Sequence, residues 1–297
     1  MYEFFRNKLK IVGIDENGYG PLLGPLIITG IKIEMEGEDP LIETDVVQYR
    51  TPFRLKDSKY IFTRSSHSYK RGEQIVFEVF NLLGIKTKTF QELLNLISIN
   101  PITIGEYGLE DFGIPVFQNE LVKTDFSNYW AKVELFFKDM KINVIMPDKF
   151  NRGIEQFNNK SIVDFKGFME VAKELIEEGK HYVLCGKIGG TDRYSRFFEA
   201  LGINYKTVIE KRVHSEYLLN EKDHIYFLLN GDEKYLPIML ASIVGKYVRE
   251  LFMLALSRKL GFNTEIPYAS GYRHDQKTYE LLKMLNDTEK KRWIRIR

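Results

Sequence analysis

The sequence has few of the features that mark secreted or membrane proteins. It contains one cysteine, which excludes an internal disulfide and indicates a reducing compartment. No apolar stretch reaches the roughly 18 residues that are needed to cross a bilayer. Residues 1–10 also lack the apolar core of a signal peptide. We therefore expect a cytoplasmic protein that makes no membrane contact.

The sequence also lacks a strong overall charge, because 43 lysines and arginines face 41 acidic residues and the net charge is +2. This balance excludes a protein that binds nucleic acid through bulk positive charge alone. Basic residues are nevertheless concentrated in residues 56–71 and 290–297. Such clusters either neutralise phosphates or form a solvated surface, and both uses stay open.

The 297 residues are 44% hydrophobic, which is enough for one large domain or two modest ones. The sequence shows no internal repeat and no low-complexity segment. Apolar runs with strand and helix periodicity alternate along it, which predicts an α/β fold: a mixed sheet flanked by helices. We expect strands at residues 10–16, 25–34, 141–147, 181–185, 203–209 and 224–229, and helices at residues 66–83, 90–99, 129–140, 162–178 and 236–260.

The most informative segment is residues 12–25, VGIDENGYGPLLGP, in which two adjacent acids end an apolar strand and a glycine-rich turn follows. Carboxylate oxygens suit Mg²⁺ or Mn²⁺, which take one or two carboxylates from the protein and complete their shells with water and phosphate oxygens. Glycines let another backbone approach closely. Neighbouring strand residues point to opposite faces, so Asp15 and Glu16 reach one site only if the strand twists or frays there.

The pattern G-I-D-E-x-G-x-G-P-x-x-G-P in this segment resembles the opening motif of the type 2 ribonuclease H family, that is, ribonuclease HII-like proteins. The resemblance implies that Asp15 and Glu16 are the first two metal ligands. It also implies that the backbone of Gly18, Tyr19 and Gly20 contacts the ribose 2′-hydroxyl. Tyr19 stands where the family has arginine, so a cationic side chain is missing at the nucleic acid.

Three further blocks follow in the order of the family. Residues 55–59, LKDSK, resemble a segment that lies near the nucleic-acid backbone, which implies substrate contacts for Ser58 and Lys59. Residues 241–250, ASIVGKYVRE, resemble the helix that carries the last metal ligand, here Glu250, with Lys246 at the substrate. Gly271 and Tyr272 resemble the start of the substrate-reading segment, in which the tyrosine stacks on the ribose.

Two acidic positions differ from the family pattern. Glu250 replaces an aspartate, and Cys185 stands at the strand end where relatives have the third acid. Sulfur is a poor ligand for Mg²⁺. Asp192, seven residues further on, is a candidate for the missing carboxylate and a catalytic role; its alternative use is to cap the next helix. Residues 186–190 have an alternative use of their own: their backbone amides can bind phosphate in a turn ahead of that helix.

The resemblance implies a single ribonuclease H-like domain over residues 1–297, with an insertion at about 85–130 and a C-terminal substrate-reading segment at about 257–297. It implies a monomeric, Mg²⁺- or Mn²⁺-dependent endonuclease that uses two ions to cut the RNA strand of RNA–DNA hybrids, or ribonucleotides embedded in DNA. The alternatives are a nucleic-acid-binding protein of the same fold that has lost cleavage, and a nuclease directed to DNA. An unrelated phosphate-binding metabolic enzyme is a further, weaker alternative.

Overall fold

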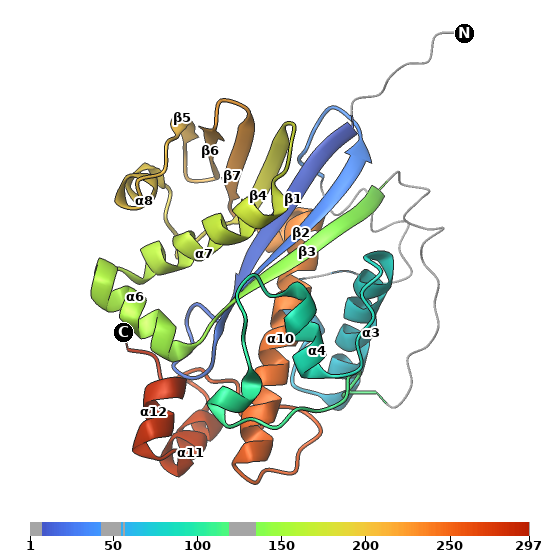
Figure 1. Cartoon of the computed structure of the whole chain (residues 1–297), viewed down its shortest axis with the longest axis vertical. Coiled ribbons are helices and arrows are strands. Elements are labelled where there is room, and N and C mark those ends of the chain that lie inside the picture. The colour runs from blue at the N-terminus through green and yellow to red at the C-terminus, as the bar shows by residue number, and fades with distance from the viewer. Residues whose placement is uncertain (1–7, 43–54, 56, 119–134, 297) are drawn as a thin grey trace.

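A computed structural model describes residues 8–42, 55, 57–118 and 135–296. Its centre is a mixed seven-stranded sheet with the strand order β3-β2-β1-β4-β7-β6-β5 (Figure 1). The strands are β1 (Lys8–Asn17), β2 (Leu26–Glu36), β3 (Leu135–Ile145), β4 (His181–Gly186), β5 (Lys206–Glu210), β6 (His214–Leu219) and β7 (Asp223–Leu228). The predicted fold class, a mixed sheet flanked by helices, is confirmed.

The three central strands, β1, β4 and β7, run parallel to one another, and the outer strands pair antiparallel. Because parallel strands end at the same edge of a sheet, the residues that follow them gather in one place. Central parallel strands are covered on both faces, which explains the continuous apolar run of β1 before Asp15.

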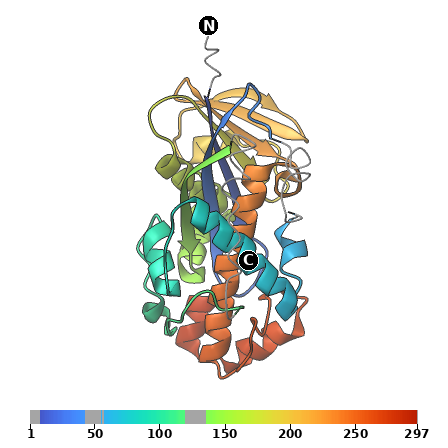
Figure 2. The ribbon, with the colours of Figure 1, turned by 90° about the vertical axis from the view of Figure 1, so that its right-hand side faces the viewer.

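Helices cover both faces of the sheet. On one face lie α3 (Ser66–Leu82), α4 (Phe90–Ile97) and α10 (Leu236–Lys259), and on the other lie α6 (Pro147–Phe157), α7 (Lys160–Leu175) and α8 (Ser195–Ala200). Figure 2 shows α3 and α10 in front of the strands. The remaining helices are α2 (Ser58–Ile61), η1 (Ile104–Tyr107), α9 (Gly231–Lys234), α11 (Gln276–Met284) and α12 (Asp287–Trp293).

Helix α10 packs directly on β1 and β2, and almost all of its side chains are buried. Gly13 of β1 makes this approach possible, since a Cβ at that position would lie 2.2 Å from the Pro237 carbonyl carbon. The close packing brings the side chains of α10 next to the end of β1. The position of Ser242 beside Asp15 follows from it.

The prediction of a helix at residues 129–140 is wrong from Leu135 onward, where the chain enters β3; its first residues lie outside the described part. Ten residues of β2 pair with β3, so the hydrogen bonds of the sheet override the local helical spacing of apolar residues. Strand β6 was not expected, although Ser215, Tyr217 and Leu219 alternate as buried residues. The other predicted elements are present: β3 begins six residues before the strand predicted at residues 141–147, and all other ends differ by three residues or fewer.

Residues 85–118 of the expected insertion form α4 and η1 and pack against α10, for example through Phe90 and Phe252 with ring centroids 4.9 Å apart. Residues 119–130 lie outside the described part. The segment after α10 forms α11 and α12. It then returns to the glycine-rich turn after β1, where Ile294 pairs with Leu23. The domain boundaries themselves stay predictions.

Candidate metal and nucleic-acid site

A cavity of about 330 Å³ opens where β1, β4 and β7 end. Acidic, basic and glycine residues from segments far apart in the sequence line it. They include Asp15, Glu16, Gly18, Tyr19, Gly20, Ser58, Lys59, Gly186, Asp232, Ser242, Lys246, Arg249 and Tyr272. The cavity therefore brings together nine of the eleven residues to which the sequence assigned a role.

Asp15 and Glu16 point to opposite faces of β1, and yet both reach the cavity. Gly186, the last residue of β4, explains how. A Cβ on Gly186 would lie 2.4 Å from Asp15 Oδ1 and 4.0 Å from Glu16 Oε2, so the two carboxylates converge over a position without a side chain. Strand β1 remains paired through Asn17, so no fraying is needed.

The pKa values of both carboxyl groups are raised well above their ordinary range. For Asp15, burial is the main cause, followed by the negative charges of Glu16 and Asp232. For Glu16, burial is again first, and the charges of Asp164 and Asp232 add to it. A hydrogen bond from Ser242 to Asp15 and the positive charge of Lys59 compensate only in part. This end of β1 therefore has uncompensated negative charge.

Asp232 on α9 is a third acid at the cavity wall, and sequence reasoning did not single it out. It follows β7, the parallel neighbour of β4, and its carboxylate lies 3.6 Å from Lys59 Nζ. Lys59 also pairs with Asp57 at 3.2 Å. Burial alone would lower the pKa of Lys59, but Asp57, Asp232 and Asp15 raise it. An acid directly after a predicted strand, as in Asn230-Gly231-Asp232, was the signal that could have found it.

Asp164 on α7 lies behind the site. Its side chain is fully buried, and neither carboxylate oxygen has a hydrogen-bond partner among the described residues. Burial raises its pKa, as does the charge of Asp15, whereas Arg295 and Lys160 act in the opposite direction. Asp164 thus adds to the negative potential at Glu16 without lining the cavity.

The donor set fits a divalent cation on Asp15 and Glu16. Mg²⁺ and Mn²⁺ accept one or two carboxylates and leave other positions to water or phosphate. A cation there would also relieve the repulsion that raises the two pKa values. Among the described residues, no group of three or more His, Cys, Asp or Glu side chains is arranged to hold a metal. The fit therefore rests on two carboxylates.

Two buried arginines hold the glycine loop that follows β1. Arg295 donates from Nε to the Gly24 carbonyl at 2.9 Å and from a terminal nitrogen to the Gly18 carbonyl. Arg249 donates to the Leu23 carbonyl at 3.2 Å. Gly18 and Gly24 have φ values of +93° and +92°, where a side chain would be strained. The loop is thus fixed from below by side chains and presents its backbone to the cavity.

Tyr19 and Tyr272 form two aromatic walls. The Tyr19 hydroxyl lies 2.8 Å from Ser161 Oγ, and Lys160 lies 4.4 Å from its ring centroid. A Cβ at Gly20 would lie 3.6 Å from the ring of Tyr272, so the glycine loop and the expected substrate-reading loop face each other. An aromatic face at this point can stack on a nucleotide.

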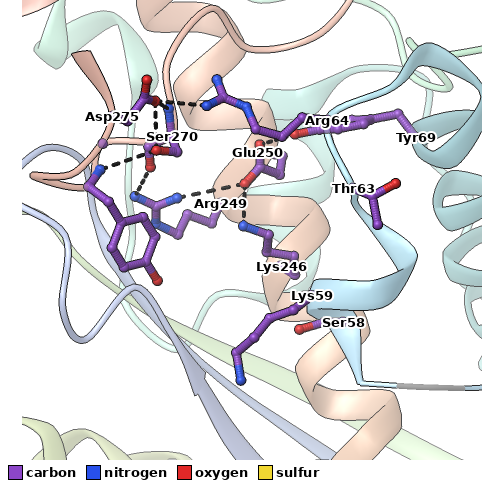
Figure 3. A network of polar contacts seen from close by, with 12 residues as sticks. Ser58, Lys59, Thr63, Arg64, Tyr69, Lys246, Arg249, Glu250, Ser270 and Asp275 are labelled. Atoms are coloured by element: carbon purple, nitrogen blue, oxygen red, sulfur yellow. Dashed lines mark hydrogen bonds and ion pairs between the residues drawn. The ribbon is translucent and has the colours of Figure 1, made fainter. Parts of the chain in front are cut away.

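Glu250 is 2% exposed and does not line the cavity. One carboxylate oxygen lies 2.7 Å from Lys246 Nζ, and the other accepts a 2.5 Å hydrogen bond from Tyr69 (Figure 3). Burial alone would raise the pKa of Glu250, but Lys246 and Arg249 lower it. The structure does not bring Glu250 to Asp15 and Glu16, and its predicted role as a ligand is untested.

Asp192 and Cys185 also lie outside the cavity lining. Asp192 pairs with Lys187, and its side chain is 45% exposed. It does not cap the next helix, because α8 begins at Ser195 with Tyr194 at the N-cap. Cys185 is fully buried among apolar side chains, where burial raises the pKa of its thiol.

Sequence comparison shows which known proteins the chain is similar to. The family model of ribonuclease HII matches residues 199–297. Ribonuclease HII of Methanococcus aeolicus is 29% identical over 230 residues, covering 72% of this chain and 74% of that protein. The chain is thus similar to ribonuclease HII proteins over most of its length. Ribonuclease HII of Sulfolobus acidocaldarius is 20% identical over 275 residues, covering 93% of this chain and 83% of that protein.

Solved ribonuclease HII structures align over nearly the whole chain at low similarity. Ribonuclease HII of Archaeoglobus fulgidus, from a complex with PCNA, aligns with a TM-score of 0.47 and 15% identity over 97% of this chain and 95% of that chain. Ribonuclease H2 of Pyrococcus horikoshii aligns with a TM-score of 0.44 and 16% identity over 93% of this chain and 86% of that chain. None of the described helices combines the length and the apolar composition that a membrane span requires.

Proposed function

We propose that this endoribonuclease of the ribonuclease H kind uses a divalent cation to hydrolyse phosphodiesters in the RNA strand of RNA–DNA hybrids, or at ribonucleotides embedded in DNA. The observation that carries the proposal is the convergence of Asp15 and Glu16 over Gly186, directly beside the glycine loop. Carboxylates with uncompensated charge next to an open backbone suit a cation and a phosphate together.

Asp15 and Glu16 would hold Mg²⁺ or Mn²⁺. A bound cation of this kind supplies Lewis acidity and lowers the pKa of the attacking water. Ser242 orients Asp15 through its hydrogen bond, and Ser58 lies 3.0 Å from Ser242 Oγ. This hydroxyl pair links the acidic strand end to the segment that carries Lys59.

Two lysines of the cavity wall, Lys59 and Lys246, would neutralise the phosphates that flank the cut. Lys59 pairs with Asp57 and Asp232, and Lys246 pairs with Glu250. Part of the binding should therefore weaken with salt.

Selection of RNA would come from the backbone of residues 18–20 and from Tyr272. The 2′-hydroxyl is the group that distinguishes RNA from DNA at a single nucleotide. The glycine loop exposes backbone donors and acceptors, and the Tyr272 ring lies beside it, 3.6 Å from the position that a Cβ on Gly20 would take. Tyr19 supplies an aromatic wall in place of a cation.

Incubation with labelled hybrid, embedded-ribonucleotide duplex and all-DNA duplex, each with Mg²⁺ or Mn²⁺, tests the proposal. Asp15→Asn should abolish cleavage, whereas Asp139→Asn, an exposed acid on β3, should leave it unchanged. Tight hybrid binding without metal-dependent cutting would indicate a binding protein instead. Equal cutting of the all-DNA duplex would indicate a nuclease of different preference. Size-exclusion chromatography tests the expected monomer.

A further inference from the structure

The segment that follows α12 runs beside the glycine loop, residues 18–24. Leu23 and Ile294 form an antiparallel β-bridge. Next to this bridge, the Arg295 amide donates to the Leu22 carbonyl at 2.9 Å. Backbone pairing therefore fixes the point at which the Arg295 side chain enters the interior.

The Arg295 side chain lies under the glycine loop and does not line the cavity, and only 3% of the residue is exposed. Its Nε donates to the Gly24 carbonyl at 2.9 Å, and one terminal nitrogen donates to the Gly18 carbonyl. The guanidinium also lies over the Phe150 ring, 4.8 Å from the ring centroid. One guanidinium thus joins the first and the last residue of the loop.

The hydrogen bond to Gly18 sets the direction of the next amide. The peptide between Gly18 and Tyr19 is trans, so the Gly18 carbonyl and the Tyr19 N–H point in opposite directions. Because Arg295 draws this carbonyl into the interior, the Tyr19 N–H points to the other side of the loop. The cavity lies on that side, since Gly18, Tyr19 and Gly20 line it.

Asp164 on α7 supplies a negative charge that faces Arg295. Burial and then the charge of Asp15 raise the pKa of Asp164, and the positive charge of Arg295 acts against them. One terminal nitrogen of Arg295 and both carboxylate oxygens of Asp164 lack a hydrogen-bond partner among the described residues. This attraction acts through space, so it balances charge without fixing the direction of the guanidinium.

We propose that Arg295 is a positioning residue for RNA selection: it holds both ends of the glycine loop so that the Tyr19 amide faces the ribose of the substrate. The inference rests on the proposed function, because it gives Arg295 control of the backbone that would read the 2′-hydroxyl. Arg295 acts through the loop and does not itself contact the substrate.

The physical reason is the conformational freedom of glycine. Gly18 and Gly24 are buried and have φ values of +93° and +92°, and glycine reaches many other conformations at little cost. Without the guanidinium, two buried carbonyls would lose their donors, which is unfavourable. Rotation of the Gly18 peptide toward the cavity would restore a partner from water, and the Tyr19 amide would then turn away from the ribose.

The test compares the wild type with Arg295→Met, Arg295→Lys, Asp164→Asn and the double variant Arg295→Met/Asp164→Asn. Fluorescence anisotropy in EDTA, without cutting, gives dissociation constants for a duplex with one ribonucleotide and for the all-DNA duplex of the same sequence. Their ratio is the ribose selectivity. Hydrogen–deuterium exchange reports the loop amides without substrate, and thermal unfolding reports stability.

Arg292→Met is the matched control. Arg292 is an exposed arginine on α12 that donates to the Glu106 carbonyl at 2.7 Å, away from the glycine loop. Its substitution also removes a guanidinium–carbonyl contact, so it should change neither the ribose selectivity nor the exchange of residues 18–24.

In Arg295→Met we expect the ribose selectivity to fall by about twofold to tenfold, which corresponds to one lost hydrogen bond. Exchange of residues 18–24 should rise, while exchange of residues 8–16 should not change. Arg295→Lys keeps the charge opposite Asp164 but lacks the planar fork that reaches two carbonyls. It should therefore melt closer to the wild type than Arg295→Met does, and still lose selectivity.

The double variant separates charge balance from loop contacts. Asp164→Asn removes the buried charge that Arg295→Met leaves without a counter-charge, so it should recover part of the lost melting temperature. It should not restore ribose selectivity, because the Gly18 and Gly24 carbonyls still lack their donor. If Arg295→Met alone does not fold, the double variant and Arg295→Lys carry the same test.

A folded Arg295→Met protein with the selectivity of the wild type, or with unchanged exchange of residues 18–24, would overturn the inference. Recovery of selectivity in the double variant would overturn it as well, since charge balance would then be responsible. Equal binding of the two duplexes by the wild type would instead refute the proposed RNA selection, while the exchange measurement would still decide whether Arg295 holds the loop.

Discussion

Carboxylates are buried both at the end of β1 and in the middle of α10, but their pKa values are shifted in opposite directions. At the end of β1, burial and the negative charges of neighbouring acids raise the pKa values of Asp15 and Glu16. In α10, Lys246 and Arg249 lower the pKa of Glu250, although this side chain is buried as well. Burial alone therefore does not identify a metal ligand. What distinguishes the two regions is whether the protein supplies the counter-charge itself.

The supply of counter-charge follows from secondary structure. On a helix, a lysine four residues before a glutamate lies on the same face, so Lys246 reaches Glu250 without help from the rest of the fold. On a strand, neighbours point apart, and the side chains of Asp15 and Glu16 meet only over Gly186 of another strand. The helical acid is neutralised locally, whereas the strand acids need an external cation.

The largest effect should come from Asp15→Asn. Removal of one of two uncompensated carboxylates should lower hybrid cleavage by more than about a hundredfold, the upper end of what mere supporting residues contribute. Quantitative cleavage assays at saturating Mn²⁺ measure it. Activity within tenfold of the wild type would contradict this difference between the two regions, since Asp15 would then be no more important for cleavage than an acid with a counter-charge.

Gly186→Ala should have the next largest effect. Its methyl group would lie 2.4 Å from Asp15 Oδ1 and must displace the carboxylate, and a shift of about 1 Å at a catalytic group can cost a hundredfold in rate. Gly105→Ala is the matched control, because a Cβ there meets nothing within 4 Å. If both variants retain cleavage and Mn²⁺ binding, the convergence of the two carboxylates over Gly186 is not required for function.

Asp275→Asn tests another acid that has partners of its own, Arg64 and Ser270, on the loop that carries Tyr272. Burial alone would raise the pKa of Asp275, but hydrogen bonds from Ser270 and Arg64 lower it to about 2. Its stabilisation is therefore present above the unfolded pKa of about 3.9 and is lost as pH falls toward 2. We expect the variant to lose about 1–2 kcal/mol in urea unfolding at pH 7. The difference from wild type should shrink toward pH 2, and a constant difference would contradict this.

Asp15→Asn should also stabilise the fold modestly at neutral pH. Because the folded pKa of Asp15 is raised, the unfolded chain loses this proton first as pH rises, and ionisation in the folded state costs stability above that point. In EDTA at pH 7 the variant should melt at a higher temperature than the wild type. Near pH 3 the difference should disappear, and a less stable variant at pH 7 would argue against uncompensated charge.

The smallest effect should come from Cys185→Ala. The thiol lies in the apolar core beside the site and does not line the cavity, so Mn²⁺ affinity should not change. Loss of one buried sulfur should lower the free energy of unfolding by about 1 kcal/mol. Weaker Mn²⁺ binding in this variant would instead indicate that Cys185 belongs to the metal site.

Local sequence was sufficient for the strand-turn motif at residues 12–25 and for most elements, because apolar periodicity and glycine placement act over a few residues. It was insufficient for β3, where pairing with β2 decided the conformation. Local sequence also did not predict the ion-pair and hydrogen-bond partners of the acidic residues. Asp232 approaches Lys59 from a separate segment, and Tyr69 meets Glu250 across 181 positions of the chain.

By itself, the sequence determined which residue types stand at the strand end: two carboxylates, the glycine turn after them and the lysine one turn before Glu250. Only the tertiary structure decided which carboxylates remain without a counter-charge. Strand order places Gly186 under Asp15 and Glu16, and the packing of α3 on α10 gives Glu250 its Tyr69 partner. The physical reason is that the energy of a buried charge depends on its neighbours in space, which the local sequence does not specify.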